Sequence, residues 1–286
     1  AVAYRDGQIP GFVHLYIGEE AVAVGVCAHL NSDDYVTSTH RGHGHALAKG
    51  ISPREVMAEL FGRVTGCSGG RGGSMHLFSS KAGFLGTSGL VGPSIPTAAG
   101  AAYMFKYRRQ PRVAVAFFGD GAVNNGSFHE WLNLASIWEL PVLFVCENNR
   151  VAVTTPLKVR TKTPRLYERF RKMGLPGTRV NGCDVESLFE AAAKAVDGAR
   201  KGKGPSLVEV MVDRWAVHVG HEYKGPVDLW FKSPYSREAS GCPVAALASV
   251  MIKKKMITID NLAALRERQR FEIERDFKKA SSFPYA

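Results

Sequence analysis

The stretch RVAVAFFGDGAVNNGSFHEWLNLASIWELPVLFVCENN, residues 112–149, decides the fold of this chain. Residues 113–118 form a short continuous apolar run, which is typical of a strand buried on both faces of a parallel sheet. From about Gly126 to Leu140, apolar residues recur at helical spacing, and Pro141 is expected to stop that helix. Residues 142–146 then form a second buried strand. The stretch therefore predicts a βαβ unit.

Polar side chains follow both predicted strands. Asp120 stands between two glycines, and Asn149 closes the second strand. The crossover of a βαβ unit is almost always right-handed and brings both strand ends to one edge of the sheet, where open α/β sheets bind ligands. Carboxylate and amide oxygens suit Mg²⁺ that is shared with a phosphate ligand, and the glycines let the backbone approach that phosphate closely.

A bare Gly-Asp-Gly is more often an ordinary turn. Here it follows a strand, precedes a helix, and is separated from the closing Asn-Asn pair by twenty-six residues, Ala122 to Glu147. That combination resembles the thiamin diphosphate motif. It predicts a site for thiamin diphosphate and Mg²⁺.

The composition bounds the alternatives. A chain of 286 residues that is 45% hydrophobic can bury one large core or two modest ones. No apolar run approaches the ~20 residues that span a bilayer, and no charged-then-apolar leader opens the chain, so we expect no membrane partner. The five cysteines are scattered and odd in number, which favours free thiols in a reducing compartment such as the cytoplasm or mitochondrial matrix.

The net charge of +11 raises a nucleic-acid-binding alternative, and residues 69–73, GGRGG, superficially match an RGG segment. However, the basic residues are spread along most of the chain, and aromatic residues do not alternate with them as a stacking platform requires. A diphosphate cofactor, anionic substrates and an acidic partner domain explain part of the surplus. We therefore expect no nucleic-acid partner, and a non-catalytic basic protein remains the alternative.

The rest of the chain predicts a doubly wound α/β fold with a mostly parallel sheet, residues 1–240, and a C-terminal helical extension packed on it, residues 241–286. Ser52-Pro53-Arg54-Glu55 is a helix start, in which Ser caps and Glu reaches back. Further helices are expected over 19–30, 96–107, 185–200, 245–255 and 259–280, and further strands over 35–39 and 206–212. Three segments are expected between these elements: a flexible glycine-rich loop over 66–73, an exposed segment over 155–172 and a mobile loop over 220–240.

The sequence His40-Arg41-Gly42-His43-Gly44-His45 follows the first expected strand. Its histidines lack the spacing that would indicate a metal site. A loop offering arginine and imidazole beside glycines fits phosphate binding better, although solvated loop histidines remain possible.

With these residues in place, the chain resembles the alpha subunit of the decarboxylating component of 2-oxo acid dehydrogenase complexes, a group that includes pyruvate, branched-chain 2-oxo acid and acetoin dehydrogenases. The resemblance runs over nearly the whole chain. It is densest in TSTHRGHGHALAKG, GRVTGCSGGRGGSMHLF, SGLVGPSIPTAAGAA and the stretch FFGDG to CENN. It implies a thiamin diphosphate-binding fold and oxidative decarboxylation of a 2-oxo acid, with pyruvate favoured and acetoin dehydrogenase as the alternative.

The resemblance also assigns residues. It implies that Asp120, Asn149 and the carbonyl of Val151 ligate Mg²⁺. It further places Gly121, Ala122, His40 and Arg41 against the diphosphate, Gly89 and Val91 against the aminopyrimidine, His14 near the substrate carboxylate, and His221 at the terminal phosphate, where it assists acyl transfer.

Two departures from the family pattern affect the last assignment. Five residues separate Arg214 from Gly220-His221, more than the family commonly has, so His218 competes with His221. Glu222 stands where mitochondrial pyruvate dehydrogenases carry a regulated serine, so we expect no phosphorylation switch there.

The resemblance finally implies partners. The chain has no second α/β half to supply the glutamate that the cofactor pyrimidine needs. A beta subunit is therefore expected to complete the site in an α₂β₂ tetramer that passes its acyl group to a lipoyl-bearing acyltransferase core.

Overall fold

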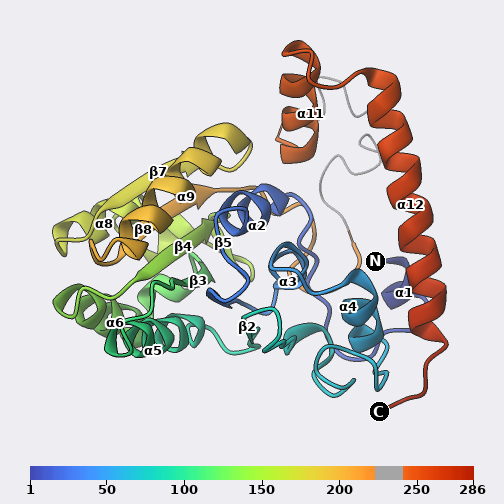
Figure 1. Cartoon of the computed structure of the whole chain (residues 1–286), viewed down its shortest axis with the longest axis horizontal. Coiled ribbons are helices and arrows are strands. Elements are labelled where there is room, and N and C mark those ends of the chain that lie inside the picture. Colours follow the sequence, from blue (N-terminus) through green and yellow to red (C-terminus); the bar gives the residue numbers. More distant parts are fainter. Residues whose placement is uncertain (223–240) are drawn as a thin grey trace.

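A computed structural model describes residues 1–222 and 241–286, and its centre is a parallel sheet of six strands in the order β2-β1-β3-β4-β8-β7 (Figure 1). Every neighbouring pair in this sheet is parallel. The strands are β1 (Tyr35–Thr37), β2 (Phe84–Gly86), β3 (Ala114–Gly119), β4 (Val142–Asn148), β7 (Gly177–Asn181) and β8 (Ser206–Met211), and a separate antiparallel pair is formed by β5 (Val151–Ala152) and β6 (Thr155–Pro156). The strand order reverses between β1 and β3, which is where doubly wound sheets form their ligand crevice.

Helices cover both faces of the sheet, as the sequence predicted (Figure 1). The helices of the described residues are α1 (Val2–Arg5), α2 (Glu20–Cys27), α3 (His43–Ala48), α4 (Pro53–Leu60), α5 (Ser94–Tyr107), α6 (Gly126–Ile137), α7 (Leu157–Arg160), α8 (Leu166–Lys172), α9 (Val185–Arg200), α11 (Pro243–Lys253) and α12 (Ile259–Ser281), with short 3-10 turns η1 (Gly73–Met75) and η2 (Ala122–Asn124). The doubly wound α/β prediction is confirmed.

Alternate residues of β3 and β4 belong to two different cores. On β3, Ala116 and Phe118 pack with α5, α6 and α8, whereas Val115 and Phe117 pack with α2 and α9. Every residue of β4 is buried. A strand covered on both faces needs apolar residues at every position, and this explains the continuous apolar runs of the sequence.

The predicted βαβ unit is present as β3, α6 and β4, with small shifts at its ends. The helix ends at Ile137 rather than at Leu140, because Glu139 adopts a positive φ of 44° and breaks the helical path before Pro141. Asn125 caps its start by accepting a hydrogen bond from the backbone of Ser127 at 3.1 Å.

Two expectations about local structure were wrong, and one strand was missed. The histidine loop after β1 becomes helical at His43, where α3 begins. The strand β2 was not expected, since its three residues are too few to show a period. The supposed exposed segment over 155–172 contains α7 and α8, whose Leu157, Leu166 and Phe170 are buried in the core. Surrounding basic residues masked this apolar spacing.

The glycine-rich loop 66–73 is organised around one carboxylate. Glu59, which is fully buried on α4, accepts backbone hydrogen bonds from the loop. Its Oε2 accepts from Ser68 at 2.7 Å and Gly70 at 2.8 Å, and its Oε1 accepts from Gly72 at 2.7 Å and Gly73 at 3.1 Å. The prediction of a flexible loop was therefore incomplete, because a single side chain satisfies four backbone donors.

The C-terminal helices stand apart from the sheet, with α12 alongside α4 and α1 (Figure 1). Helix α12 packs against α4 through an ion pair between Arg54 and Asp276 at 2.6 Å and a contact between Phe61 and Phe277 rings at 5.0 Å. The two predicted terminal helices are confirmed as α11 and α12. The division at residue 240 stays a prediction, and most of the predicted 220–240 loop lies outside the described residues. Among the described residues, no helix is long and apolar enough to cross a bilayer.

Candidate active site

A cavity opens at the carboxyl ends of β1, β3, β4 and β8. Its lining residues come from these strand ends and from the loops before α5 and before α2. Ten of the eleven predicted site residues lie in its wall: His14, His40, Arg41, Gly89, Val91, Asp120, Gly121, Ala122, Asn149 and Val151. Parallel pairing in register between β3 and β4 brings Asp120 and Asn149 to the same edge, as the βαβ geometry predicts.

Asp120 is 1% exposed and pairs with a cation that the sequence did not reveal. Its Oδ2 accepts from Arg160 Nη2 at 2.5 Å, and its backbone carbonyl accepts from Arg160 Nη1 at 3.3 Å. Burial raises the pKa of Asp120, while the hydrogen bonds of Arg160 and of the Asn149 backbone oppose that shift. Arg160 lies on α7, forty residues away in the sequence, so no local pattern could identify it.

Asn149 is oriented by two neighbours. Its Nδ2 donates to Glu19 Oε1 at 3.1 Å, and its Oδ1 accepts from the backbone N–H of Val151 at 3.1 Å. Glu19 is 2% exposed, and burial, reinforced by Glu147, raises its pKa to about 7. The Glu19 oxygen fixes which end of the Asn149 amide carries the donor, so the amide oxygen faces the side of Val151.

Small residues form the wall beside Asp120. A Cβ on Gly121 would lie 3.1 Å from the Cβ of Ala152, so glycine at this position allows the turn to pass close to the β5 segment. Gly89, Leu90 and Val91, in the segment before α5, also line the cavity, and Leu90 and Val91 are 74% and 54% exposed.

Arg41 is almost entirely buried, with 5% of its surface exposed. Its guanidinium donates to the backbone carbonyl of Leu15 and, at 3.2 Å, to that of His218, so it joins three separate loops. Arg214 also lines the cavity, and its Nη2 donates to the carbonyl of Val153 at 3.0 Å. The cavity therefore has two guanidinium groups in its wall, which is favourable for an anionic ligand.

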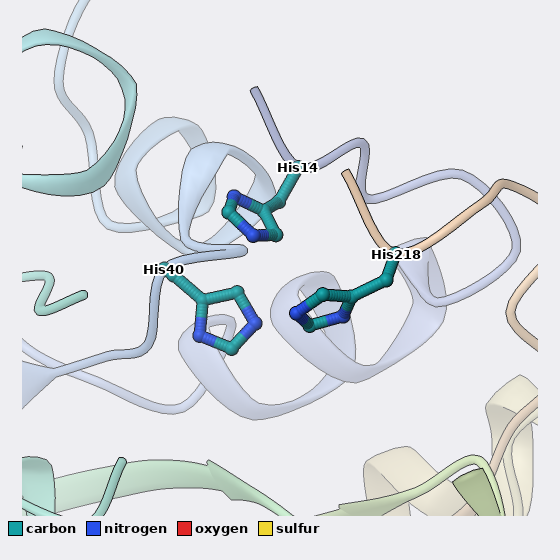
Figure 2. A group of neighbouring side chains, drawn as sticks. All are labelled: His14, His40 and His218. Carbon is teal, nitrogen blue, oxygen red and sulfur yellow. The ribbon is translucent and has the colours of Figure 1, made fainter. Parts of the chain in front are cut away.

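Three histidines from distant segments meet at the cavity (Figure 2). The ring centroids of His14 and His40 are 4.4 Å apart, those of His14 and His218 are 4.9 Å apart, and those of His40 and His218 are 5.3 Å apart. Burial and the neighbouring positive groups lower the pKa of His14 to about 3 and that of His40 to about 4, and they also lower the pKa of His218.

The structure does not bring His221 into this cavity. Its ring instead lies 6.3 Å from that of Tyr4, and His218 occupies the cavity wall. The backbone of Gly220 donates to the carbonyl of Val13 at 2.9 Å, which fixes the chain two residues after His218 and directs His221 elsewhere. The sequence had indicated this outcome as an alternative, because the segment between Arg214 and Gly220 is longer than in the family and His218 was therefore considered beside His221.

Sequence reasoning also missed a buried network beneath the cavity. Glu147 Oε1 accepts from the Tyr16 hydroxyl at 2.5 Å and lies 3.1 Å from His45 Nε2. His45 Nδ1 in turn contacts Ser38 Oγ at 2.8 Å, and its ring stacks on Phe117 at 3.8 Å. These groups come from four segments. The only sequence signal was the position of Glu147 directly before the Asn-Asn pair.

This chain has a doubly wound parallel sheet with a cavity at its switch point, lined by oxygen-bearing side chains and two arginines. That is the class of α/β protein that binds ligands at the carboxyl ends of its strands. The comparison with known families makes this specific. The family model described as "Dehydrogenase E1 component" matches residues 1–286, and the chain belongs to that family. The family is thiamin diphosphate-dependent.

Individual relatives agree with the family match. The chain is 50% identical over 211 residues to the alpha subunit of the acetoin:2,6-dichlorophenolindophenol oxidoreductase of Bacillus subtilis, covering 74% of this chain and 63% of the relative. It is 40% identical over 291 residues to the alpha subunit of pyruvate dehydrogenase E1 of Porphyra purpurea, covering 99% and 84%. A chloroplastic pyruvate dehydrogenase E1 alpha-3 subunit of Oryza sativa is 41% identical over 295 residues, covering 99% and 69%. The chain thus spans between 63% and 84% of the length of these relatives.

Proposed function

We propose that this chain is the alpha subunit of a thiamin diphosphate-dependent 2-oxo acid dehydrogenase. It would oxidatively decarboxylate a 2-oxo acid, with pyruvate favoured, and transfer the acyl group to a lipoyl group. The observation that carries the proposal is the meeting of Asp120, Asn149 and Gly121 in one cavity wall of a chain whose whole length matches the family.

The residues of this wall fit Mg²⁺ and a diphosphate. The Asp120 carboxylate, the Asn149 amide oxygen and the Val151 carbonyl are hard oxygen donors of the kind that Mg²⁺ prefers, and waters and phosphate oxygens would complete its octahedron. Arg160 holds one carboxylate oxygen of Asp120, which leaves Oδ1 for the ion. The cofactor, once bound, supplies the electron sink for decarboxylation.

The remaining wall residues would bind and orient. Arg41, Gly121 and Ala122 would contact the diphosphate, and His40 would lie beside it. Gly89 and Val91 would support the aminopyrimidine. His14 would lie near the substrate carboxylate, where its neutral imidazole can donate or accept a hydrogen bond. His218 takes the place proposed for His221, because it is the one that lines the cavity.

A beta subunit would cover the open side of the cavity. Leu90, Val91 and Val153 line it, yet they are 74%, 54% and 52% exposed. Large apolar side chains at the mouth of a site favour burial against a partner. This supports an α₂β₂ assembly that serves a lipoyl-bearing acyltransferase core.

Acetoin is the second candidate substrate. It is favoured by the 50% identity to the Bacillus subtilis acetoin-oxidising subunit over 211 residues. The family match favours either enzyme over the basic nucleic-acid-binding alternative. A cytoplasmic or mitochondrial-matrix location, with five free cysteines, remains part of the proposal.

The test is cofactor binding by the assembly of this chain with its beta partner. Asp120→Ala should abolish Mg²⁺-dependent thiamin diphosphate binding, measured by titration calorimetry with and without Mg²⁺. Asp197→Ala is the matched control, since Asp197 is exposed on α9, outside the cavity wall, and pairs with Lys201 at 2.9 Å. Unchanged affinity in Asp120→Ala would remove the basis of the proposed site.

A second measurement assigns the substrate and the partner requirement. The assembled enzyme is offered pyruvate, branched-chain 2-oxo acids and acetoin with an artificial electron acceptor, and this chain alone is assayed in parallel. We expect turnover only in the assembly. Turnover by the isolated chain would refute the need for a beta subunit.

A further inference from the structure

The cluster of His14, His40 and His218 could bind a second kind of ligand when the cofactor is absent. We propose that these three side chains form a binding site for a borderline-soft divalent transition-metal ion, Zn²⁺ above all, separate from the oxygen ligands of Asp120 and Asn149. Figure 2 shows the three rings facing a common space from three different loops.

The donor atoms are close enough to share one ion. One ring nitrogen from each histidine can be chosen so that all three lie within 4.8 Å of one another. Tetrahedral zinc at about 2.0–2.1 Å from each nitrogen requires separations of roughly 3.4 Å. Side-chain rotations that move the ring nitrogens by about an ångström would therefore bring the three donor atoms to zinc-binding distance, without a shift of the backbone.

Two ring nitrogens of the cluster lack a hydrogen bond within the part of the chain that the structure describes. The Nδ1 atoms of His14 and His218 are buried and have no hydrogen-bond partner. An unpaired buried nitrogen is unfavourable, and coordination would satisfy it. The lowered pKa values of all three histidines keep their rings neutral at pH 7, and the neutral ring is the form that ligates metals.

The main opposing factor is the positive charge of Arg41. Its guanidinium donates to the carbonyls of Leu15 and His218, and the buried carboxyl groups of Glu19 and Glu147 interact with it electrostatically. Arg214 adds a second positive charge nearby. We therefore expect the affinity for the metal ion to be lower than that of a dedicated structural zinc site. The affinity should come from coordination by the imidazole nitrogens and not from attraction between charges.

The two sites should select different ions. Mg²⁺ requires oxygen ligands at near-octahedral geometry, whereas imidazole suits Zn²⁺ and its neighbours. A metal held by the three histidines would occupy the part of the cavity where the proposed function places the substrate carboxylate. Because the proposed function also places His40 beside the diphosphate and His218 in the place of His221, Zn²⁺ should inhibit competitively with substrate and should also weaken thiamin diphosphate binding. This consequence rests on the proposed function, but the binding itself does not.

The test uses Co²⁺ as a spectroscopic probe of the full chain, with excess Mg²⁺ present and no thiamin diphosphate. We expect one Co²⁺ per chain, the intense visible absorption of four-coordinate cobalt with nitrogen ligands, and displacement by Zn²⁺. His218→Ala and, separately, His40→Gln should each weaken the binding at least about tenfold, because losing a direct ligand exceeds the loss of an outer-shell partner.

His129→Ala is the matched control, because His129 is exposed on α6 and contacts Arg169 outside the cluster. Thermal melts of each variant establish that it is folded. Equal affinity in His218→Ala and the wild type, absence of a visible cobalt spectrum, or a thiolate charge-transfer band would each overturn the proposal. Because thiamin diphosphate is left out, failure here is distinct from failure of the cofactor site, which the Asp120→Ala titration measures.

Discussion

Replacing Glu59 with glutamine should loosen the loop that reaches the active-site cavity. The Glu59 carboxylate accepts four backbone hydrogen bonds from residues 68–73, two on each oxygen. A glutamine keeps one acceptor oxygen and turns its NH₂ group toward two of the four donors. The loop leads directly into η1 and to Met75, which lines the cavity, so this change in packing reaches the site.

The size of the effect follows from the bonds lost. A hydrogen bond to a charged group contributes about 1.5–3 kcal/mol net, so losing two destabilises by about 3–6 kcal/mol. Glu59→Ala would lose all four and approach the about 5–15 kcal/mol that holds a whole domain folded, so glutamine is the informative change. At roughly 2 °C per kcal/mol for a chain of this size, the melting temperature should fall by at least about 6 °C.

Thermal melting and amide hydrogen exchange measure this. Exchange should accelerate at the N–H groups of Ser68, Gly70, Gly72 and Gly73, with little change in β3 and β4. The control is Glu55→Gln on the same helix, because the Glu55 side chain is exposed and forms the capping box with Ser52. A Glu59→Gln protein within about 1 kcal/mol of the wild type and with unchanged loop protection would refute the reasoning.

Three further predictions concern stability and the site. Asp34→Asn removes the charge that holds Arg200 in two hydrogen bonds of 3.1 and 2.6 Å. Chemical denaturation should show that the free energy of unfolding falls by about 2–4 kcal/mol, less than for a fully buried pair, because Arg200 is partly exposed. A fall below about 1 kcal/mol would contradict this prediction. Burial lowers the pKa of His43 to about 4 from its usual 6.5, so the unfolded chain takes up this proton first as the solution is acidified. The wild type should therefore lose stability as pH falls from 6.5 through 4, and His43→Gln should show a shallower slope in denaturation curves across that window; identical slopes would argue against a neutral His43. In the assembled enzyme, His218→Ala should lower turnover at least about tenfold, and His221→Ala should lower it by less than about twofold. A larger loss in His221→Ala than in His218→Ala would show that His221, and not His218, acts in the site.

The predicted meeting of Asp120 and Asn149 agrees with the structure, because it depended only on strand ends. Asp120 and Asn149 were placed together because each follows a buried apolar run, and parallel pairing of β3 with β4 leaves no choice about which edge they share. The sequence did not predict hydrogen bonds between side chains of distant segments. Arg160 lies in a segment expected to be exposed, and Glu19 precedes Asn149 by 130 residues, yet both contact the predicted metal ligands.

By itself, the sequence determined the βαβ unit, the parallel sheet, the capping box at Ser52 and the edge at which Asp120 and Asn149 meet. These features follow from hydrophobic period and backbone geometry over a few neighbouring residues. Only the tertiary structure decided that His218 and not His221 enters the cavity, since a hydrogen bond between Gly220 and Val13 sets the path of that segment. It also decided that His14, His40 and His218 form one cluster. Contacts between distant segments depend on how whole elements pack, and no local pattern in the chain records them.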